Sequence, residues 1–326
     1  MTALSARRRT LAAGAVLVAG ALLLTGCGDD DKKDDVKSTP SGGTAPTSAG
    51  ASAPPAGGAL FVKLPKQYQD SKVVKIGSEV AYPPVEFKDK DGKTFIGFDI
   101  DLAKAIGEKL GVKVEIEDMT FGSLITGLDS KRIDLIMSAM SDNKDRQTGM
   151  DEGKKVGDGI DFVDYFNAGG SILVKKGNPQ NIKTLDDLCG KTVALQKATT
   201  HEETANKQSD KCKADGKGAI TIQAYEHDNE ALLRVKQGAA AADISDFPVA
   251  AYAAQTGGDG NDFEVVGEQI DPGPYGIGVA KNNSQLRDVV KEAVEQLIAD
   301  GTYGKILEKW NVKQGAVTEV KINGGS

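Results

Sequence analysis

The segment SAMSDNKDR, from Ser138 to Arg146, directly follows the apolar run IDLIM and contains the residues with the most evident chemistry. Two serine hydroxyls and a guanidinium after a buried strand could donate hydrogen bonds to a small anion. Arginine suits this role because its planar fork matches a carboxylate and stays charged at neutral pH. In the alternative interpretation, Arg146 pairs with Asp142 or Asp145 in a solvated loop. The segment therefore predicts either an anion-binding loop or an exposed one.

Strand-like and helix-like segments alternate around this loop. In the first part of the fold, the expected elements are strands at 72–78, 112–116 and 133–140 and helices at 98–111 and 121–131. In the first of these helices, Asp99 is the expected N-cap and Gly111 follows the last turn. The pattern is that of a βαβαβ unit.

A second unit of the same kind follows. Its expected strands are 191–195, 219–225 and 240–245, and its expected helices are 184–190, 200–209, 229–238 and 247–258. The last part of the chain again has the pattern of the first unit, with an expected strand at 273–283 and expected helices at 284–301 and 302–310. Two units in tandem predict an α/β fold with two Rossmann-like lobes, each with a doubly wound sheet.

Polar loops follow three of the expected strands, one of them being SAMSDNKDR. The second is QKATTHEE, in which Thr199 and Thr200 open a helix, and the third is DISDF, which ends near Asp246. In open α/β sheets, ligands bind beyond the carboxyl ends of the strands. Free N–H groups at a helix N-terminus also suit an anion. We therefore expect these loops to meet at one cleft between the lobes.

Composition narrows the classes of function. The net charge is −7, and without Arg7, Arg8 and Arg9 it becomes −10, from 37 basic and 47 acidic residues. An acidic chain with 5% aromatic residues argues against nucleic-acid binding. His201 and His227 are the two histidines; neither has a partner at metal-site spacing, and both are expected at the surface. We expect no metal, no cofactor and no catalytic residues, since no Ser-His-Asp or Cys-His arrangement is visible.

The first 26 residues predict a signal peptide, with a basic ARRR and a short apolar stretch. The following LLTGC resembles a bacterial lipobox, which implies cleavage before Cys27 and lipid attachment to that cysteine. An ordinary secretory signal with a chance cysteine is the alternative. Residues 27–70 are rich in charge, Gly, Ser, Pro and Ala and predict a disordered tether. The chain is thus expected on the extracytoplasmic face of the cell membrane.

Cys189 and Cys212 are the remaining cysteines. In an oxidising extracytoplasmic setting, a disulfide between them is the natural expectation, and two buried thiols are the alternative.

Several motifs occur in the order typical of a known family. They are GSEVAYPPVEFKDKDGKTFIGFDIDLAKAIGEKLG, FGSLITGLDSKRIDLIMSAMSDNKDR and DGTYGKILEKW. Across about residues 72–312, the chain resembles the polar amino-acid-binding proteins of ABC importers, the family-three solute-binding proteins. The resemblance implies a periplasmic-binding-protein fold of type II, with a two-segment hinge near NAGGS and DPGPYG. It divides the chain into lobe 1 (71–168 plus 272–315), lobe 2 (169–271) and a C-terminal tail (316–326).

The function implied by the resemblance is a lipid-anchored receptor that delivers a polar amino acid to the permease of an ABC transporter. A monomer without enzymatic activity is expected. The alternatives are an enzyme of the cyclohexadienyl dehydratase type on the same fold and a sensory or interaction lipoprotein. Family likeness also assigns Arg146 to the ligand's α-carboxylate, with Ser138, Ala139 and Ser141 as neighbouring contacts. Lobe closure would complete the site.

The remaining site residues also come from the resemblance. Thr199 and Thr200 match the family's Gly-Thr-Thr, and Asp246 matches its ammonium-binding aspartate, although all three could serve as helix caps. Tyr82 and Phe121 match an aromatic sandwich around the ligand's side chain, or they could belong to the core.

An acid at the position of Glu79 favours a basic side chain in the ligand, with a surface role as the alternative. Asp243 is expected to face a helix or solvent. The chain departs from the family pattern at Ala198, which replaces a glycine, at GAAAAD before Asp246, and at an inserted segment, 149–159, expected to form a loop near the cleft.

Overall fold

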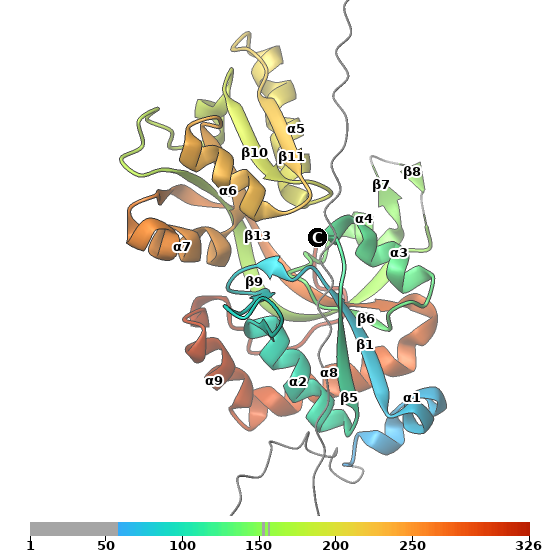
Figure 1. Ribbon diagram of the computed structural model, residues 1–326. Helices are drawn as coiled ribbons and strands as arrows, with labels where there is room; N and C mark the ends of the chain where they lie inside the picture. Colours follow the sequence, from blue (N-terminus) through green and yellow to red (C-terminus); the bar gives the residue numbers. More distant parts are fainter. Residues whose placement is uncertain (1–57, 152–153, 156) are drawn as a thin grey trace, which may run out of the picture. The chain divides into compact units, whose positions relative to one another are not determined.

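An eight-stranded sheet runs through the protein in the order β11-β10-β12-β9-β13-β6-β1-β5. The computed structural model describes residues 58–151, 154–155 and 157–326 (Figure 1). The expected signal peptide, Cys27 and most of the expected tether lie outside these residues. We use lobe 1 for the part around β1, β5 and β6, and lobe 2 for the part around β10, β11 and β12.

Two long antiparallel strands connect the lobes, β9 (Ile160–Lys175) and β13 (Phe263–Ala280). Their pairing changes register between Val266 and Ile270, between Ile270 and Gly273, and between Tyr275 and Gly276. Each change interrupts the ladder where the chain passes from one lobe to the other. The predicted α/β class with a two-segment hinge is confirmed.

In lobe 1, three strands are parallel: β1 (Val73–Ser78), β5 (Lys113–Asp118) and β6 (Leu135–Ile136). Its helices are α1 (Lys66–Ser71), α2 (Phe98–Leu110), α3 (Leu124–Asp129), α4 (Lys144–Thr148), α8 (Ser284–Ala299) and α9 (Thr302–Lys309). A small sheet contains β2 (Ala81–Tyr82), β3 (Glu86–Lys88) and β4 (Phe95–Ile96). The apolar faces of α2 and α8 form one core on the sheet, and α3 covers a second.

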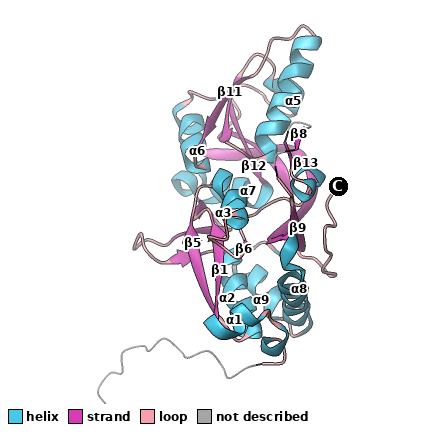
Figure 2. Ribbon diagram, turned by 90° about the vertical axis from the view of Figure 1, so that its right-hand side faces the viewer, coloured by secondary structure: helices cyan, strands magenta, loops and turns pink. Residues whose placement is uncertain are grey.

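In lobe 2, three strands are also parallel: β10 (Thr192–Gln196), β11 (Thr221–Tyr225) and β12 (Ala242–Asp246). Its helices are α5 (Thr200–Ala214), α6 (Asp228–Gln237) and α7 (Phe247–Thr256). Figure 2 shows α5 and α6 on opposite sides of β11, and separate apolar clusters lie beneath them. With helices on both faces of its parallel strands, lobe 2 is a doubly wound α/β unit.

Several local predictions were wrong in detail. Asp99 is not the N-cap of α2: Gly97 holds that position, with φ 133° and a site where a Cβ would lie 2.0 Å from the carbonyl oxygen of Val85. The expected strand 133–140 shortens to β6, because the chain turns into the cleft there. The expected helix 121–131 begins with a 3-10 turn, Phe121–Ser123, and the helix at 184–190 is the 3-10 turn Leu185–Leu188.

Part of the expected tether is folded. Leu60, Leu64 and Tyr68 are buried in the core of lobe 1, and the Tyr68 hydroxyl donates to Asp134 Oδ1 at 3.0 Å. Leu60 precedes the 3-10 turn Phe61–Lys63, Leu64 follows it in an extended conformation, and Tyr68 lies in α1. The expected tether includes this segment because its few apolar residues directly follow a low-complexity tract.

The inserted segment forms a small hairpin, β7 (Met150–Asp151) with β8 (Lys154–Lys155), rather than a plain loop. The predicted disulfide is confirmed: Cys189 and Cys212 are bonded, with their Cα atoms 5.4 Å apart. It ties the turn before β10 to the last part of α5. Within the described residues, no helix is both long and apolar enough to cross a membrane.

Candidate functional site

The residues assigned to a ligand site by sequence analysis line one cavity between the lobes. They are Glu79, Tyr82, Phe121, Ser138, Ala139, Ser141, Arg146, Thr199, Thr200 and Asp246. Both lobes contribute, because the loops after β1, β6, β10 and β12 leave the sheet at carboxyl ends that face each other. Sequence analysis missed three further lining residues, Glu86, Gln196 and His201.

Arg146 lies in the short helix α4. The side-chain oxygen of the N-cap residue Asn143 accepts a hydrogen bond from the Arg146 N–H at 2.8 Å. Its Nη1 donates to the carbonyl oxygen of Ser141 at 2.9 Å, and its guanidinium lies 5.4 Å from the centre of the Phe121 ring. Burial lowers the Arg146 pKa, and the charges of Glu203 and Asp246 partly offset this. Within the described residues no acid lies within ion-pair distance of the guanidinium, so the alternative of a local surface pair does not apply.

Asp246 ends β12 and faces Arg146's lobe. Its Oδ2 accepts from the Tyr82 hydroxyl at 3.0 Å, and its N–H donates to the same hydroxyl at 2.9 Å. Its other oxygen, Oδ1, lies 3.4 Å from His201 Nε2. Asp246 holds the N-cap position of α7, as the cap alternative has it, but its side chain makes no capping hydrogen bond to that helix. Asp246 therefore presents a carboxylate to the cavity, held from both lobes.

His201 is buried, which makes the expectation of a surface histidine wrong. It follows Thr200 in the first turn of α5, and its ring lies over Gly170, where a Cβ would lie 3.1 Å from Nδ1. Burial alone lowers the His201 pKa, but the charge of Asp246 and a hydrogen bond to it raise the pKa above its usual value.

The start of α5 has the conformation that the family motif needs. Ala198 adopts φ 61°, the left-handed conformation that glycine takes more readily. Thr199 caps the helix: its hydroxyl accepts from the Glu202 N–H at 3.3 Å and donates to the carbonyl oxygen of Gln196 at 2.7 Å. Capping is thus present, and Thr199 and Thr200 still line the cavity.

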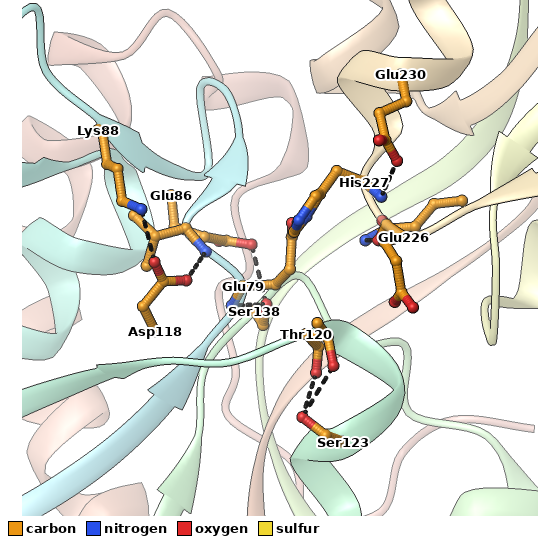
Figure 3. A network of polar contacts seen from close by, with 12 residues as sticks. Glu79, Glu86, Lys88, Asp118, Thr120, Ser123, Ser138, Glu226, His227 and Glu230 are labelled. Atoms are coloured by element: carbon orange, nitrogen blue, oxygen red, sulfur yellow. Dashed lines mark hydrogen bonds and ion pairs between the residues drawn. The ribbon is translucent and has the colours of Figure 1, made fainter. Parts of the chain in front are cut away.

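Two buried acids, Glu79 and Glu86, also line the cavity. Glu79 is buried and hydrogen-bonds across the cleft to Nδ1 of His227, at the start of α6 (Figure 3). The alternative of a surface role for Glu79 is therefore wrong, whereas His227 lies at the surface as expected, with 40% of its side chain exposed. Burial raises the Glu79 pKa, and the hydrogen bond to His227 opposes the shift.

Ser138 connects Glu79 to a second acid, Glu86. The Ser138 hydroxyl accepts from the Glu79 N–H at 2.9 Å and donates to Glu86 Oε1 at 3.0 Å. Burial and the charge of Asp99 raise the Glu86 pKa well above its usual value. Asp99 itself, bonded to the Tyr165 hydroxyl at 2.7 Å, has its pKa raised by burial to about 7.

A matching pair of acids lies in lobe 2. Asp243 does not face solvent: it is fully buried near Asp228 of α6 and accepts from the Ser245 hydroxyl at 2.7 Å. Burial raises the Asp243 pKa to about 7 and that of Asp228 well above its usual value. Each lobe therefore has a buried pair of acids, Glu86 with Asp99 in lobe 1 and Asp228 with Asp243 in lobe 2.

A comparison with known families accounts for this arrangement. The profile of the bacterial extracellular solute-binding proteins, family 3, matches residues 74–313. The chain belongs to this family.

Relatives of this family-3 protein bind amino acids. Arginine-binding protein ArgT of Corynebacterium glutamicum is 30% identical over 261 residues, which cover 80% of this chain and 81% of ArgT. The L-cystine-binding protein TcyJ of Escherichia coli K12 is 30% identical over 236 residues, 72% of this chain and 81% of TcyJ. These curated relatives are binding proteins and not enzymes.

Among solved structures, an ancestral arginine-binding protein bound to arginine is 37% identical, with a TM-score of 0.65. The match covers 73% of this chain and 98% of the ancestral protein's chain. An ancestral amino acid-binding protein, a precursor of cyclohexadienyl dehydratase, is 34% identical with a TM-score of 0.65 and covers 75% and 97%. The family-3 protein is thus an extracellular solute-binding protein with the fold of these receptors.

Proposed function

We propose that this family-3 protein binds a free amino acid between its lobes and delivers it to the permease of an ABC transporter. The observation that carries the proposal is the pairing of charges: Arg146 from lobe 1 and Asp246 from lobe 2 line the same cavity. A zwitterion that loses its water on burial needs a partner for each charge. Arg146 would bind the α-carboxylate, with help from Ser141, and Asp246 would bind the ammonium group.

We further propose that the ligand's side chain is basic, with arginine as the first candidate. Glu79 and Glu86 supply carboxyl oxygens to the lining of the cavity, and Gln196 adds an amide. A guanidinium beside these acids would oppose the effect of burial on their pKa values, because a nearby positive charge favours the ionised form. The rings of Tyr82 and Phe121 also line the cavity and offer apolar surface to the methylene groups of the ligand's side chain. Two of the similar proteins bind arginine, which supports arginine as the first candidate.

The receptor is also proposed to be attached to the membrane through lipid on Cys27. Mass spectrometry of the mature N-terminal peptide tests this directly. Diacylglycerol on Cys27 is the expected result, and an unmodified N-terminus at another residue would contradict it.

Calorimetric titration of the purified protein with arginine, and then with the other amino acids, tests the ligand. Replacing Arg146 with Ala should abolish measurable binding, a loss of more than about 3 kcal/mol, because the carboxylate would be buried without its charged partner. The melting temperature of the ligand-free protein should barely change. Arg132→Ala is the matched control, since Arg132 is exposed and lies outside the cavity. An intact affinity in Arg146→Ala would remove the carboxylate assignment.

An enzymatic reaction would appear in a separate assay. Incubation of the protein with prephenate or arogenate should leave both compounds unchanged.

A further inference from the structure

The last residues of the chain fold back along lobe 1 and do not hang free. Ile322 forms an antiparallel bridge with Val163 of β9, and the Asp164 N–H donates to the carbonyl oxygen of Lys321 at 2.9 Å. Asn323 Oδ1 accepts from the Phe162 N–H at 2.8 Å. We call residues 320–325 the C-terminal strap. It lies beyond residue 313, where the match to the family profile ends, and its end lies beside α4 in Figure 1.

Two glycines of the strap hold a pair of acids. The Gly325 N–H donates to Asp142 Oδ2 at 2.8 Å, and the Gly324 N–H donates to Asp164 Oδ2 at 3.0 Å. Gln147 Nε2 completes the arrangement, with bonds to Asp142 Oδ1 at 2.6 Å and to the carbonyl oxygen of Gly325 at 3.3 Å. Asp142 is 4% exposed, so these partners replace its water.

Asp142 directly follows Ser141, whose carbonyl oxygen orients Arg146. On one side, β13 holds this loop: the Asp142 N–H donates to the carbonyl oxygen of Pro274 at 2.9 Å, and Ser141 bridges to Tyr275. On the other side, the strap holds the Asp142 side chain. The peptide that positions the guanidinium is therefore fixed between the hinge strand and the strap.

The contact leaves no room for a side chain at Gly324 or Gly325. A Cβ on Gly325 would lie 2.0 Å from the carbonyl oxygen of Asp142, and one on Gly324 would lie 2.4 Å from Asp164 Oδ2. Because the first of these neighbours is backbone, the strap or the loop would have to move. Any larger residue at 325 should thus displace the strap from Asp142.

We propose that the C-terminal strap is a positioning element of the ligand site, which holds the Ser141–Asp142 peptide so that Arg146 faces the cavity. The inference rests on the proposed role of Arg146. It predicts that loss of the strap weakens ligand binding without any change in a residue that contacts the ligand.

The test is the variant Gly325→Val, with Gly304→Val in α9 as the matched control, because a Cβ on Gly304 meets no atom within 4 Å. Calorimetry with arginine, well below the melting temperature, should show an affinity about tenfold weaker for Gly325→Val, as expected for a displaced anchoring group. Hydrogen exchange should become faster in peptides that cover residues 141–148. Gly304→Val should match the wild type in both measurements.

Two further variants separate positioning from general stability. Val290→Ala removes buried methyl groups in α8, away from the cavity, and should lower the melting temperature with the affinity unchanged. A chain ended after Ile322 provides the same test if Gly325→Val does not fold. Wild-type affinity and unchanged exchange at 141–148 in a strap variant would overturn the proposal. If the wild type bound no amino acid, the proposed function would fail, while hydrogen exchange would still report whether the strap fixes the loop.

Discussion

The two charged groups of the cavity are held in different ways. Lobe 1 holds Arg146 with its own backbone, through the carbonyl oxygen of Ser141. Lobe 2 presents Asp246, but one of its carboxylate oxygens is bonded to the Tyr82 hydroxyl of lobe 1. The cation is thus positioned within one lobe, whereas the anion is fully positioned only when the lobes meet. Substitutions on the two sides should therefore separate ligand contact from lobe closure.

The largest effect in this comparison is expected from Asp246→Asn. An amide of the same shape keeps the contact with Tyr82 but removes the charge that faces the ligand's ammonium group. Affinity should fall about a hundredfold, or roughly 3 kcal/mol. Calorimetry measures this loss, and Asp259→Asn, at an exposed position just after α7, is the control. A variant that still binds at wild-type strength would show that the ammonium group lies elsewhere.

A smaller effect is expected from Tyr82→Phe, which removes the hydroxyl that joins the lobes and leaves the ring. Affinity should fall about tenfold, or about 1.4 kcal/mol, because the two hydrogen bonds between this hydroxyl and Asp246 are both lost. Small-angle scattering should also report a larger open fraction without ligand. Tyr165→Phe is a close control, because the Tyr165 hydroxyl bonds Asp99 within lobe 1. Equal losses of affinity in both variants would argue against a role in closure.

The smallest effect concerns His201 and depends on pH. The folded protein raises the His201 pKa above 6.5, so its contact with Asp246 stabilises the fold fully below about pH 6.5. That contribution is lost as the pH rises through the folded pKa. His201→Gln should therefore lower the melting temperature more at pH 5.5 than at pH 8.5, with a difference in stability of at most about 1 kcal/mol. Thermal unfolding at both pH values measures it, and a pH-independent difference would mean that the pair carries no charge.

Sequence alone predicted the fold and brought together the residues that line the cavity, because the family motifs lie at the carboxyl ends of strands. It could not predict Glu86 or His201. Glu86 belongs to a short hairpin, and the sequence pattern there gives no sign that this side chain is buried. His201 lies in a helix of mostly polar residues, where nothing distinguishes it from an exposed side chain. Their neighbours come from distant parts of the chain: Ser138 donates to Glu86, and Asp246 and Gly170 lie against His201.

The termini of the fold show the same limit. Leu60, Leu64 and Tyr68 are visible in the sequence as apolar residues, but their segment is short and adjoins the low-complexity tract. The strap was not readable, because its bonds to Asp142 and Asp164 use backbone N–H groups that any residue has. The one sign of the strap in the sequence is the pair of glycines at 324 and 325, where the structure has no room for a Cβ.

The paired long strands also set an order of assembly. Every strand of lobe 2 comes from one continuous stretch of chain, whereas the sheet of lobe 1 needs β13 between β9 and β6, and its core needs α8 and α9. During synthesis, which starts at the N-terminus, most strands of lobe 2 are made before the last helices of lobe 1. We therefore expect the half that holds Arg146 to be completed last, and we expect shortening of the chain from its C-terminal end to affect that half first.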